Sequence, residues 1–120
     1  MGKTALEKAQ IEMWQRWAEF YFLMPTGMCF QHTSGYFKDR MTPIKAWGEE
    51  CRIQVLRFLD TMNEQLANHK YLAGEEFSIA DITALCAIDF SRVNKISISD
   101  TQIHLQRWYD EVSMRPSAKA

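Results

Sequence analysis

FSIADITALCAIDF, residues 77–90, joins a helix-start signal to a run with very few polar side chains. Ser78 and Asp81 have the spacing of a capping box, in which each side chain accepts a hydrogen bond from the other residue's backbone N–H. Phe77 and Ile82 flank this box at the positions of a hydrophobic staple. Beyond Asp81 the stretch is apolar on nearly every side, as in a helix packed inside a larger helical assembly. It therefore predicts the central, buried helix of the fold.

The carboxylate of Asp81 could serve either structure or chemistry. Its place in the box, where a negative charge suits the helix N-terminus, favours structure. Loss of the cap is then expected to cost about 1 kcal/mol or somewhat more. Asp89 has no such explanation, so it needs water, a cation or a helix-end partner if its face is packed.

Length and composition indicate a single domain, residues 1–120. The chain is 47% hydrophobic and 24% charged with a net charge of −1, which offers no basic surface for nucleic acid. The N-terminus has no apolar signal core. The long uncharged stretch, residues 20–37, contains Pro25, Gly27 and Gly35, which suit a membrane span poorly. We therefore expect a cytoplasmic protein that binds neither nucleic acid nor membrane.

The N-terminal segment predicts an amphipathic helix that opens with a capping box from Thr4 to Glu7. Residues 20–24 are apolar on every side and need cover from other parts of the protein. Pro25 then forces a kink or a stop, and the sequence does not decide whether a helix resumes beyond it. The apolar side of this helix, expected to face the core, carries Leu6, Ala9, Met13, Trp17 and Phe20.

The rest of the chain predicts a loop over residues 31–41 and two further helices. Thr42-Pro43 supplies an N-cap and first position for a long helix that ends near residues 68–70. Gly74 makes a turn before the central helix, and Ser99 with Gln102 forms a capping box for the last one. The core positions expected on these helices are Ile44, Trp47, Cys51, Val55, Phe58, Met62, Leu66, Ile103, Trp108 and Val112. With no strand pattern, the fold class is all-α, a bundle of about four or five helices.

Residues that carry chemistry in other proteins are scattered here. His32, His69 and His104 lie in different segments without ligand spacing, so we expect no metal site. Paired glutamates sit side by side in sequence, where their side chains point apart. No catalytic residue is expected in this chain.

The three cysteines, Cys29, Cys51 and Cys86, are odd in number and widely spaced. Reduced thiols are therefore expected in place of a disulfide framework. Cys86, inside the predicted buried helix, should be unreactive, whereas Cys29, just past Pro25, should be more accessible. A structural role is favoured for both.

Several motifs, taken together, resemble one known family. Tyr71-Leu72-Ala73-Gly74, the box at residues 77–82, His104-Leu105-x-x-Trp108 and Arg115-Pro116-Ser117 resemble the C-terminal helical domain of cytosolic glutathione transferases, of a bacterial type. The resemblance covers almost the entire chain. In that family a thioredoxin-like domain precedes the helical one, binds glutathione and supplies the Ser, Tyr or Cys that activates its thiol. This sequence lacks that domain, so it resembles an excised domain or a truncated homologue.

The resemblance also implies a substrate surface, because in the family the later part of the first helix forms a wall of the pocket for hydrophobic electrophiles. By position this wall would comprise Tyr21, Phe22, Leu23, Met24 and Met28. The bottom-up alternative for this aromatic region is core or subunit interface. The parent protein would be a homodimer that uses glutathione as co-substrate, and the chain alone would bind no cofactor and conjugate nothing.

A second function remains open, since similar helical domains also serve as assembly surfaces in translation-related and regulatory proteins. The alternative is thus a non-catalytic protein-interaction module. A stand-alone ligand-binding domain is a third possibility, for which Trp14 and Trp17 would report binding by fluorescence.

Overall fold

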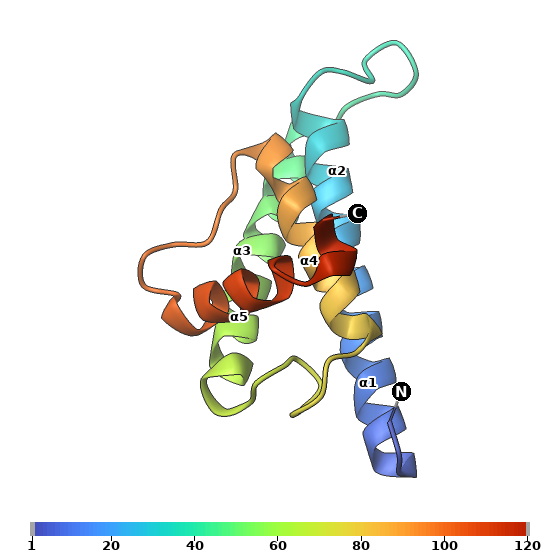
Figure 1. Cartoon of the computed structure of the whole chain (residues 1–120). Helices are drawn as coiled ribbons and strands as arrows, with labels where there is room; N and C mark the ends of the chain where they lie inside the picture. Colours follow the sequence, from blue (N-terminus) through green and yellow to red (C-terminus); the bar gives the residue numbers. More distant parts are fainter. Residues whose placement is uncertain (1, 120) are drawn as a thin grey trace.

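Five α-helices make up most of residues 2–119, the part of the chain that the computed structural model describes (Figure 1). Because α1, η1 and α2 follow one another without a break, the five helices form four rods, as the predicted bundle requires. No strand occurs among these residues. The elements are α1 (Ala5–Ala18), the π-helical turn η1 (Glu19–Leu23), α2 (Met24–Thr33), α3 (Lys45–Asn68), α4 (Ile79–Ser91), the 3-10 turn η2 (Arg92–Asn94), α5 (Ile103–Ser113) and the 3-10 turn η3 (Pro116–Lys119).

The core lies where α4 meets its neighbours. Helix α4 contacts α1, η1, α2 and α5, while α3 packs along α2 and α5. A loop at one end of the molecule joins α2 to α3, and the two helices run antiparallel to each other (Figure 1). The largest side chains that this arrangement buries completely are Phe22, Val55, Met62, Leu66, Leu72, Leu105, Trp108 and Val112.

Asp81 joins three parts of the chain through one buried carboxylate. Its Oδ1 accepts hydrogen bonds from the backbone N–H of Leu72 (3.1 Å) and the indole Nε1 of Trp108 (2.8 Å). Its Oδ2 accepts from the backbone N–H of Ser78 (2.9 Å), and the Ser78 hydroxyl caps the first turn of α4 in return. The predicted capping box is confirmed. The box thus also anchors the preceding connector and α5.

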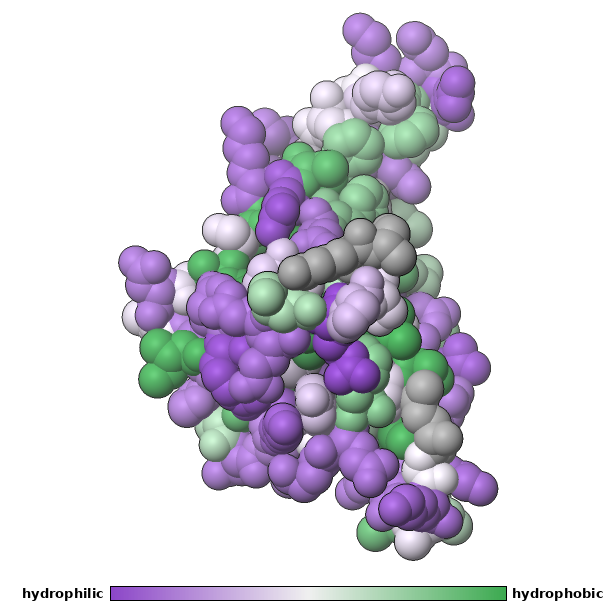
Figure 2. Space-filling model, viewed as in Figure 1, coloured by the Kyte–Doolittle hydropathy of each residue, from purple (hydrophilic) through white to green (hydrophobic). Residues whose placement is uncertain are grey.

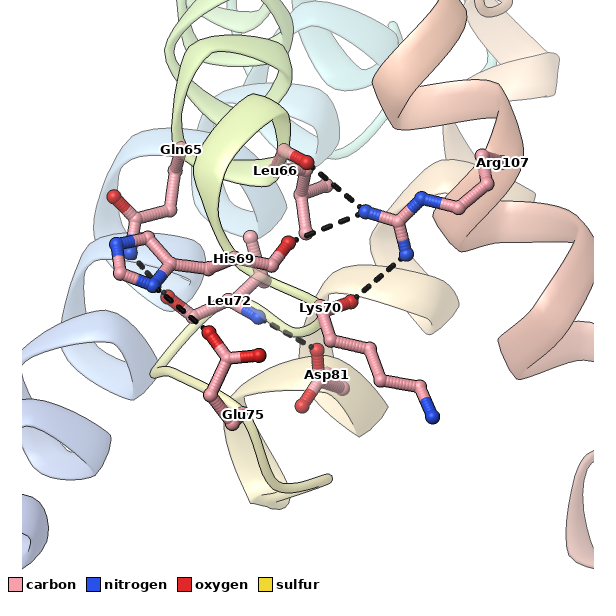
Figure 3. Close-up of polar contacts among 8 residues, drawn as sticks. All are labelled: Gln65, Leu66, His69, Lys70, Leu72, Glu75, Asp81 and Arg107. Atoms are coloured by element: carbon pink, nitrogen blue, oxygen red, sulfur yellow. Dashed lines mark hydrogen bonds and ion pairs between the residues drawn. The ribbon is translucent and has the colours of Figure 1, made fainter.

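The connector between α3 and α4 is a tight turn closed by Tyr71 and Gly74, which exchange two backbone hydrogen bonds of 2.8 and 3.3 Å. Gly74 has φ of 142°, a conformation that side chains disfavour, so it makes the predicted turn. Gln65 of α3 donates its side-chain N–H to the carbonyl of Leu72 at 2.9 Å (Figure 3). The turn thereby holds Leu72 where its own N–H meets Asp81.

Arg107 of α5 ties the end of α3 to the same junction. Its guanidinium donates to the carbonyls of Leu66 (2.9 Å), His69 (3.2 Å) and Lys70 (3.0 Å), which Figure 3 shows converging on one side chain. These carbonyls stand at the C-terminus of α3, where a cation is favourable. One arginine therefore caps α3 from another helix.

Phe77, one of the two residues of the predicted hydrophobic staple, packs between the connector and the C-terminal segment. Its ring lies edge-on to Tyr71 at 5.8 Å between centroids, and the Arg115 guanidinium stands 3.8 Å from its centroid. Ile82 is exposed on α4. A contact between Phe77 and Ile82 stays a prediction.

The turn η1 carries the helix past Pro25, which the sequence left as a kink or a stop. In η1 the backbone N–H of Met24 donates to the carbonyl of Glu19, five residues earlier. Pro25 then occupies the first turn of α2, where its missing N–H matters least. The Thr26 hydroxyl donates to the carbonyl of Phe22 at 2.8 Å. The helix therefore resumes beyond Pro25.

The buried face of α1 is not the predicted one. Trp14 and Ala18 are buried, whereas Leu6, Met13, Trp17 and Phe20 are exposed. On the buried side Gln15 accepts a hydrogen bond of 2.8 Å from the Thr83 hydroxyl of α4. The prediction was wrong because it chose the face with the most large apolar side chains. The small Ala18, which has no exposed surface, lies on the face that is buried.

Two predicted helix starts also require correction. Helix α3 begins at Lys45 with Ile44 as its N-cap, whose N–H donates to His32 Nδ1 at 2.9 Å, so Thr42-Pro43 precede the helix. The predicted core positions Ile44 and Trp47 are exposed. No side chain caps the first turn of α3, and His32 of α2 instead holds the N–H of the N-cap residue Ile44, a contact that the local sequence does not reveal.

Helix α5 likewise begins later than its predicted box. Its N-cap is Gln102, and the first N–H groups of His104 and Leu105 both donate to Asn63 Oδ1 of α3 at 3.0 Å. Ser99 donates its backbone N–H to the Gln102 side chain at 3.0 Å. Ile103, predicted to face the core, is exposed.

Replacing Asp81 by Ala should lower the free energy of unfolding by about 3 kcal/mol or more, because three buried N–H donors lose their acceptor. Urea unfolding followed by tryptophan fluorescence measures it. Asp100→Ala, at an exposed aspartate, is the matched control and should change stability by less than about 0.5 kcal/mol. A loss near 1 kcal/mol for Asp81→Ala, the value of a cap alone, would contradict the three-way anchor.

Candidate functional site

The segment predicted to line a substrate pocket divides between the surface and the core. Tyr21 is 54% exposed and Met24 46% exposed, while Leu23 and Met28 are half-buried. Phe22 is fully buried, with its ring centroid 5.7 Å from that of Phe58. The helical path turns these side chains in different directions. Tyr21 and Met24 therefore offer the larger accessible surfaces, and Phe22 belongs to the core beneath this segment.

A shallow groove runs between α1–η1 and α3 and includes Tyr21. Its volume is about 260 Å³, and Trp17 stands edge-on to the buried Trp14 with 5.0 Å between centroids. Arg57 of α3 provides the charged group of this groove. Trp17 had been expected in the core. The groove is lined by Trp17, Tyr21, Gln54, Arg57, Phe58 and Thr61.

Helix α4 exposes a second apolar surface, which we call the α4 face: Ile82, Cys86, Phe90 and Val93. They recur at steps of three and four residues along α4 and η2, which places them on one side of the helix. The opposite side buries Ala80, Asp81, Ala84, Ala87 and Ile88. Figure 2 shows one side of the molecule, on which the surface over α5 is mostly hydrophilic and hydrophobic residues gather over α2 and beside α4.

The structure corrects two expectations about the central helix and one about Cys29 of α2. Within this chain α4 is buried on one side only, although it is apolar on both. Cys86, expected to be buried, is exposed, whereas Cys29, expected to be accessible, is buried. The three- and four-residue spacing of the exposed residues was visible in the sequence, but equally apolar positions on the other side concealed it.

Asp89, which needed a partner, finds one on α5. It accepts a hydrogen bond of 2.7 Å from the hydroxyl of Tyr109, and Arg92 lies 3.6 Å from the same carboxylate. Burial raises the pKa of Tyr109, the Asp89 carboxylate adds to the rise, and Arg92 opposes it. Tyr109 therefore stays protonated at neutral pH and links α4 to α5.

Two of the three histidines, His32 and His69, serve as local hydrogen-bonding groups. His32 accepts the N–H of Ile44, and His69 lies 3.2 Å from Glu75. Within the described residues 2–119, no group of three or more His, Cys, Asp or Glu side chains could hold a metal ion. The same part of the chain contains no helix long and apolar enough to cross a membrane.

Asp81 has the most unusual electrostatic setting of the described carboxylates. Burial raises its pKa above the ordinary value of 3.8, while hydrogen bonds from Leu72, Trp108 and Ser78 oppose the rise. All of its close contacts are with donors of neighbouring segments. Both of its carboxylate oxygens accept hydrogen bonds within the chain, and the side chain is fully buried, so neither oxygen is accessible to a ligand.

The exposed surfaces therefore offer aromatic rings, aliphatic groups and thioethers. Such groups bind apolar partners by contact, and methionine adapts to irregular shapes. Both surfaces, the α1–α3 groove and the α4 face, are suited to binding.

Comparison with known proteins decides the family. The family model described as "Glutathione S-transferase, C-terminal domain" matches residues 22–116. The chain belongs to the glutathione S-transferase family. It corresponds to the C-terminal helical domain of that family, as its motifs implied.

Similar glutathione S-transferases resemble the chain along nearly its whole length. Glutathione S-transferase 2 of Saccharomyces cerevisiae is 33% identical, over 98% of this chain and 52% of the relative. The crystal structure of Gtt2 from Saccharomyces cerevisiae superimposes with a TM-score of 0.92 at 32% identity, covering 98% of this chain and 58% of that one. The chain thus spans about half the length of these relatives.

A relative with a different name also matches. Probable elongation factor 1-gamma 1 of Arabidopsis thaliana is 28% identical over 97% of this chain and 28% of its own length. Glutathione S-transferase-like helical domains therefore occur within proteins of more than one name. The bacterial type of the family stays a prediction.

The raised pKa of Asp81 gives the stability of this glutathione S-transferase domain a definite pH dependence. The folded chain keeps the Asp81 proton to higher pH than the unfolded chain. The resulting stabilisation is complete below 3.8 and is lost as pH rises through the folded pKa. The free energy of unfolding of the wild type minus that of Asp81→Asn should therefore be larger near pH 4 than near pH 7.

Urea unfolding of both proteins at the two pH values measures this difference. The exposed Asp100→Asn variant, compared with wild type in the same way, controls for changes in overall charge. A difference that grows toward neutral pH would mean that the N–H hydrogen bonds outweigh burial and hold the Asp81 pKa below its ordinary value.

Proposed function

We propose that the chain is the helical half of a glutathione transferase whose parent conjugates glutathione to hydrophobic electrophiles. The single observation that carries the proposal is the exposed apolar α4 face, on a chain that matches only about half of its glutathione S-transferase relatives. In the parent, a thioredoxin-like domain would bind glutathione and activate its thiol. Glutathione is then a co-substrate of the whole protein, and this domain needs no cofactor of its own.

The thioredoxin-like domain is proposed to cover the α4 face. Several apolar side chains exposed together on one side of a helix favour a protein partner over water. Ile82 is 46% exposed and Val93 48% exposed, on a helix whose other side is completely packed. Two domains of one chain can bury such surface without the translational cost of binding a separate protein.

The substrate wall is proposed to lie on η1 and α2, with Tyr21, Met24, Leu23 and Met28 contacting the electrophile. Tyr21 and Met24 carry most of the accessible surface, and the thioether of Met24 can adapt to different shapes. Phe22 would act from the core, by fixing the turn against Phe58. The catalytic group itself would belong to the other domain.

A homodimeric, cytoplasmic parent completes the proposal. Trp17 and Arg57, which flank the α1–α3 groove, offer an aromatic and a guanidinium group, two types enriched at protein interfaces. The groove is therefore the proposed contribution of this domain to the dimer.

A non-catalytic interaction module is the second candidate function. The similarity to Probable elongation factor 1-gamma 1 favours it, because a domain of this type also occurs in a protein with that name. A coding sequence upstream that specifies a thioredoxin-like domain with a glutathione-binding turn would support the enzyme. A natural product limited to these 120 residues would support the interaction module.

Isolated, the chain should show no turnover of 1-chloro-2,4-dinitrobenzene with glutathione above the uncatalysed rate, because thiol activation belongs to the proposed partner domain. Absorbance of the conjugate measures the rate, and full-length glutathione S-transferase 2 of yeast serves as the positive control. Turnover by the isolated chain at a rate comparable with that control would overturn the proposed division of labour.

The isolated chain should also self-associate through the α4 face. Phe90→Glu, which puts a charge on this face, should shift sedimentation toward the monomer. Ile103→Glu, at an exposed isoleucine of α5, is the matched control and should leave association unchanged. A wild type that is strictly monomeric at every concentration, or an equal effect of both variants, would count against an exposed docking face.

A further inference from the structure

Helices α2 and α3 face each other in a fixed antiparallel register. An ideal Cβ built on Gly48 would lie 3.0 Å from the Cβ of His32, and the Phe22 and Phe58 rings are 5.7 Å apart. The residue numbers of the facing positions sum to 80 in both cases, one near the loop and one near η1. The two pairs are therefore consistent with one antiparallel register from η1 to the end of α2.

The same register places Cys29 opposite Cys51. Each lies three residues from the close contact at Gly48 and His32, or about 4.5 Å along its helix axis. Both cysteines are only 1% exposed. Gly48 allows the two helices to approach closely, because a Cβ there would stand 2.6 Å from Thr33 Cγ2 and 3.0 Å from the Cβ of His32, with the carbonyl oxygen of Cys29 next at 3.5 Å. This register places two small, buried thiols at the same level of the two helices, about one turn from the close approach at Gly48.

Electrostatics gives an independent sign that the two thiols are neighbours. Burial raises the pKa of Cys51, and the Cys29 sulfur is the next largest cause of the rise, ahead of the adjacent Glu50. Such a Coulomb effect requires proximity. Cys86 does not appear among these causes and lies exposed on α4.

We propose that Cys29 and Cys51 form a reversible disulfide between α2 and α3 when the folded chain meets a hydroperoxide. Disulfides need Cβ atoms about 3.5–4.5 Å apart, and both cysteines lie within one turn of the point where Gly48 lets the two helices approach closely. The bond would tie the two ends of the loop over residues 34–44. It is independent of the proposed transferase function, since neither cysteine belongs to the substrate wall or the α4 face.

The chemistry balances with the hydroperoxide as oxidant. One thiolate attacks the terminal oxygen of ROOH, which breaks the O–O bond and gives a sulfenic acid and ROH. The second thiol then attacks the sulfenic sulfur, so that the S–S bond forms and water leaves. Two thiols and one hydroperoxide thereby give one disulfide, one alcohol and one water, with two electrons passing to the peroxide.

Burial and the raised pKa of Cys51 make the pair slow to react at rest. The oxidant must reach it through local opening of the helix ends beside the loop. Low concentrations of urea should therefore accelerate the reaction before the chain unfolds globally. This behaviour would separate the pair from the exposed Cys86, whose oxidation needs no opening.

Hydrogen peroxide treatment of the folded 120-residue chain tests the proposal. After alkylation in denaturant, mass spectrometry should show that Cys29 and Cys51 are no longer alkylated and that one peptide links them, whatever the oxidation state of the exposed Cys86. Dithiothreitol should restore all three thiols. The oxidised monomer should unfold at a Tm higher by roughly 5 °C or more, because the cross-link restricts the unfolded chain.

Two variants distinguish a Cys29–Cys51 bond in the folded chain from pairings that involve Cys86. Cys86→Ser alters only an exposed residue, and its two remaining thiols should both disappear within the monomer. Cys51→Ala should keep Cys29 reduced in the monomer, and oxidation of unfolded wild type should give mixed pairings that include Cys86. Cys29 and Cys51 that remain alkylatable in folded Cys86→Ser, or a folded-state linkage through Cys86, would overturn the proposal.

Discussion

The buried carboxylate of Asp81 is the interaction on which the arrangement of the helices depends. It receives N–H groups from the connector at Leu72, from the start of α4 at Ser78 and from α5 at Trp108. A charge without water is costly unless several donors surround it, so these segments must come together for the charge to be tolerated. Arg107 reinforces the junction from α5 by capping the end of α3. The cluster thus fixes α5 and the end of α3 against the start of α4, and the apolar core beside it holds the remaining helices.

The same helix also presents the surface that gives the domain its proposed role. One side of α4 is lined with small residues such as Ala84 and Ala87, which let neighbouring helices approach closely. The other side carries the larger apolar residues of the α4 face. A helix that is apolar on both sides but packed on only one is typical of a domain made to join another. The glutathione S-transferase relatives, about twice as long as this chain, agree with that interpretation.

Much of the fold could be predicted from the sequence, because its strongest signals are local. The capping box at Ser78 and Asp81 and the turn at Gly74 depend on residues adjacent in sequence, and both are confirmed. The end of α3 near Asn68 follows from the same kind of signal. The motifs were specific enough in combination to indicate the family. The loss of unfolding free energy expected on replacing Asp81 exceeds that of a cap alone, because Leu72 and Trp108 also donate hydrogen bonds to its carboxylate. These two contacts could not be predicted from the sequence.

The errors arise where a distant residue replaces a local signal. Asn63 caps α5 and His32 accepts the first N–H before α3, which no nearby sequence could reveal. The buried face of α1 depends on the small Ala18, so counting large apolar residues chose the wrong side. The substrate wall had a positional basis only, and the structure refines it by turning Phe22 inward and Tyr21 outward.

Docking of a thioredoxin-like domain on the α4 face is tested most directly by methyl NMR. The chain would be titrated with the separately produced N-terminal half of yeast glutathione S-transferase 2, which is its 33% identical relative. The methyl signals of Ile82 and Val93 should shift with added domain, while those of Ile103 on α5, which is even more exposed, stay in place. Shifts at Ile103 with none at Ile82 and Val93, or no shift at saturating concentrations, would contradict the assignment of this face.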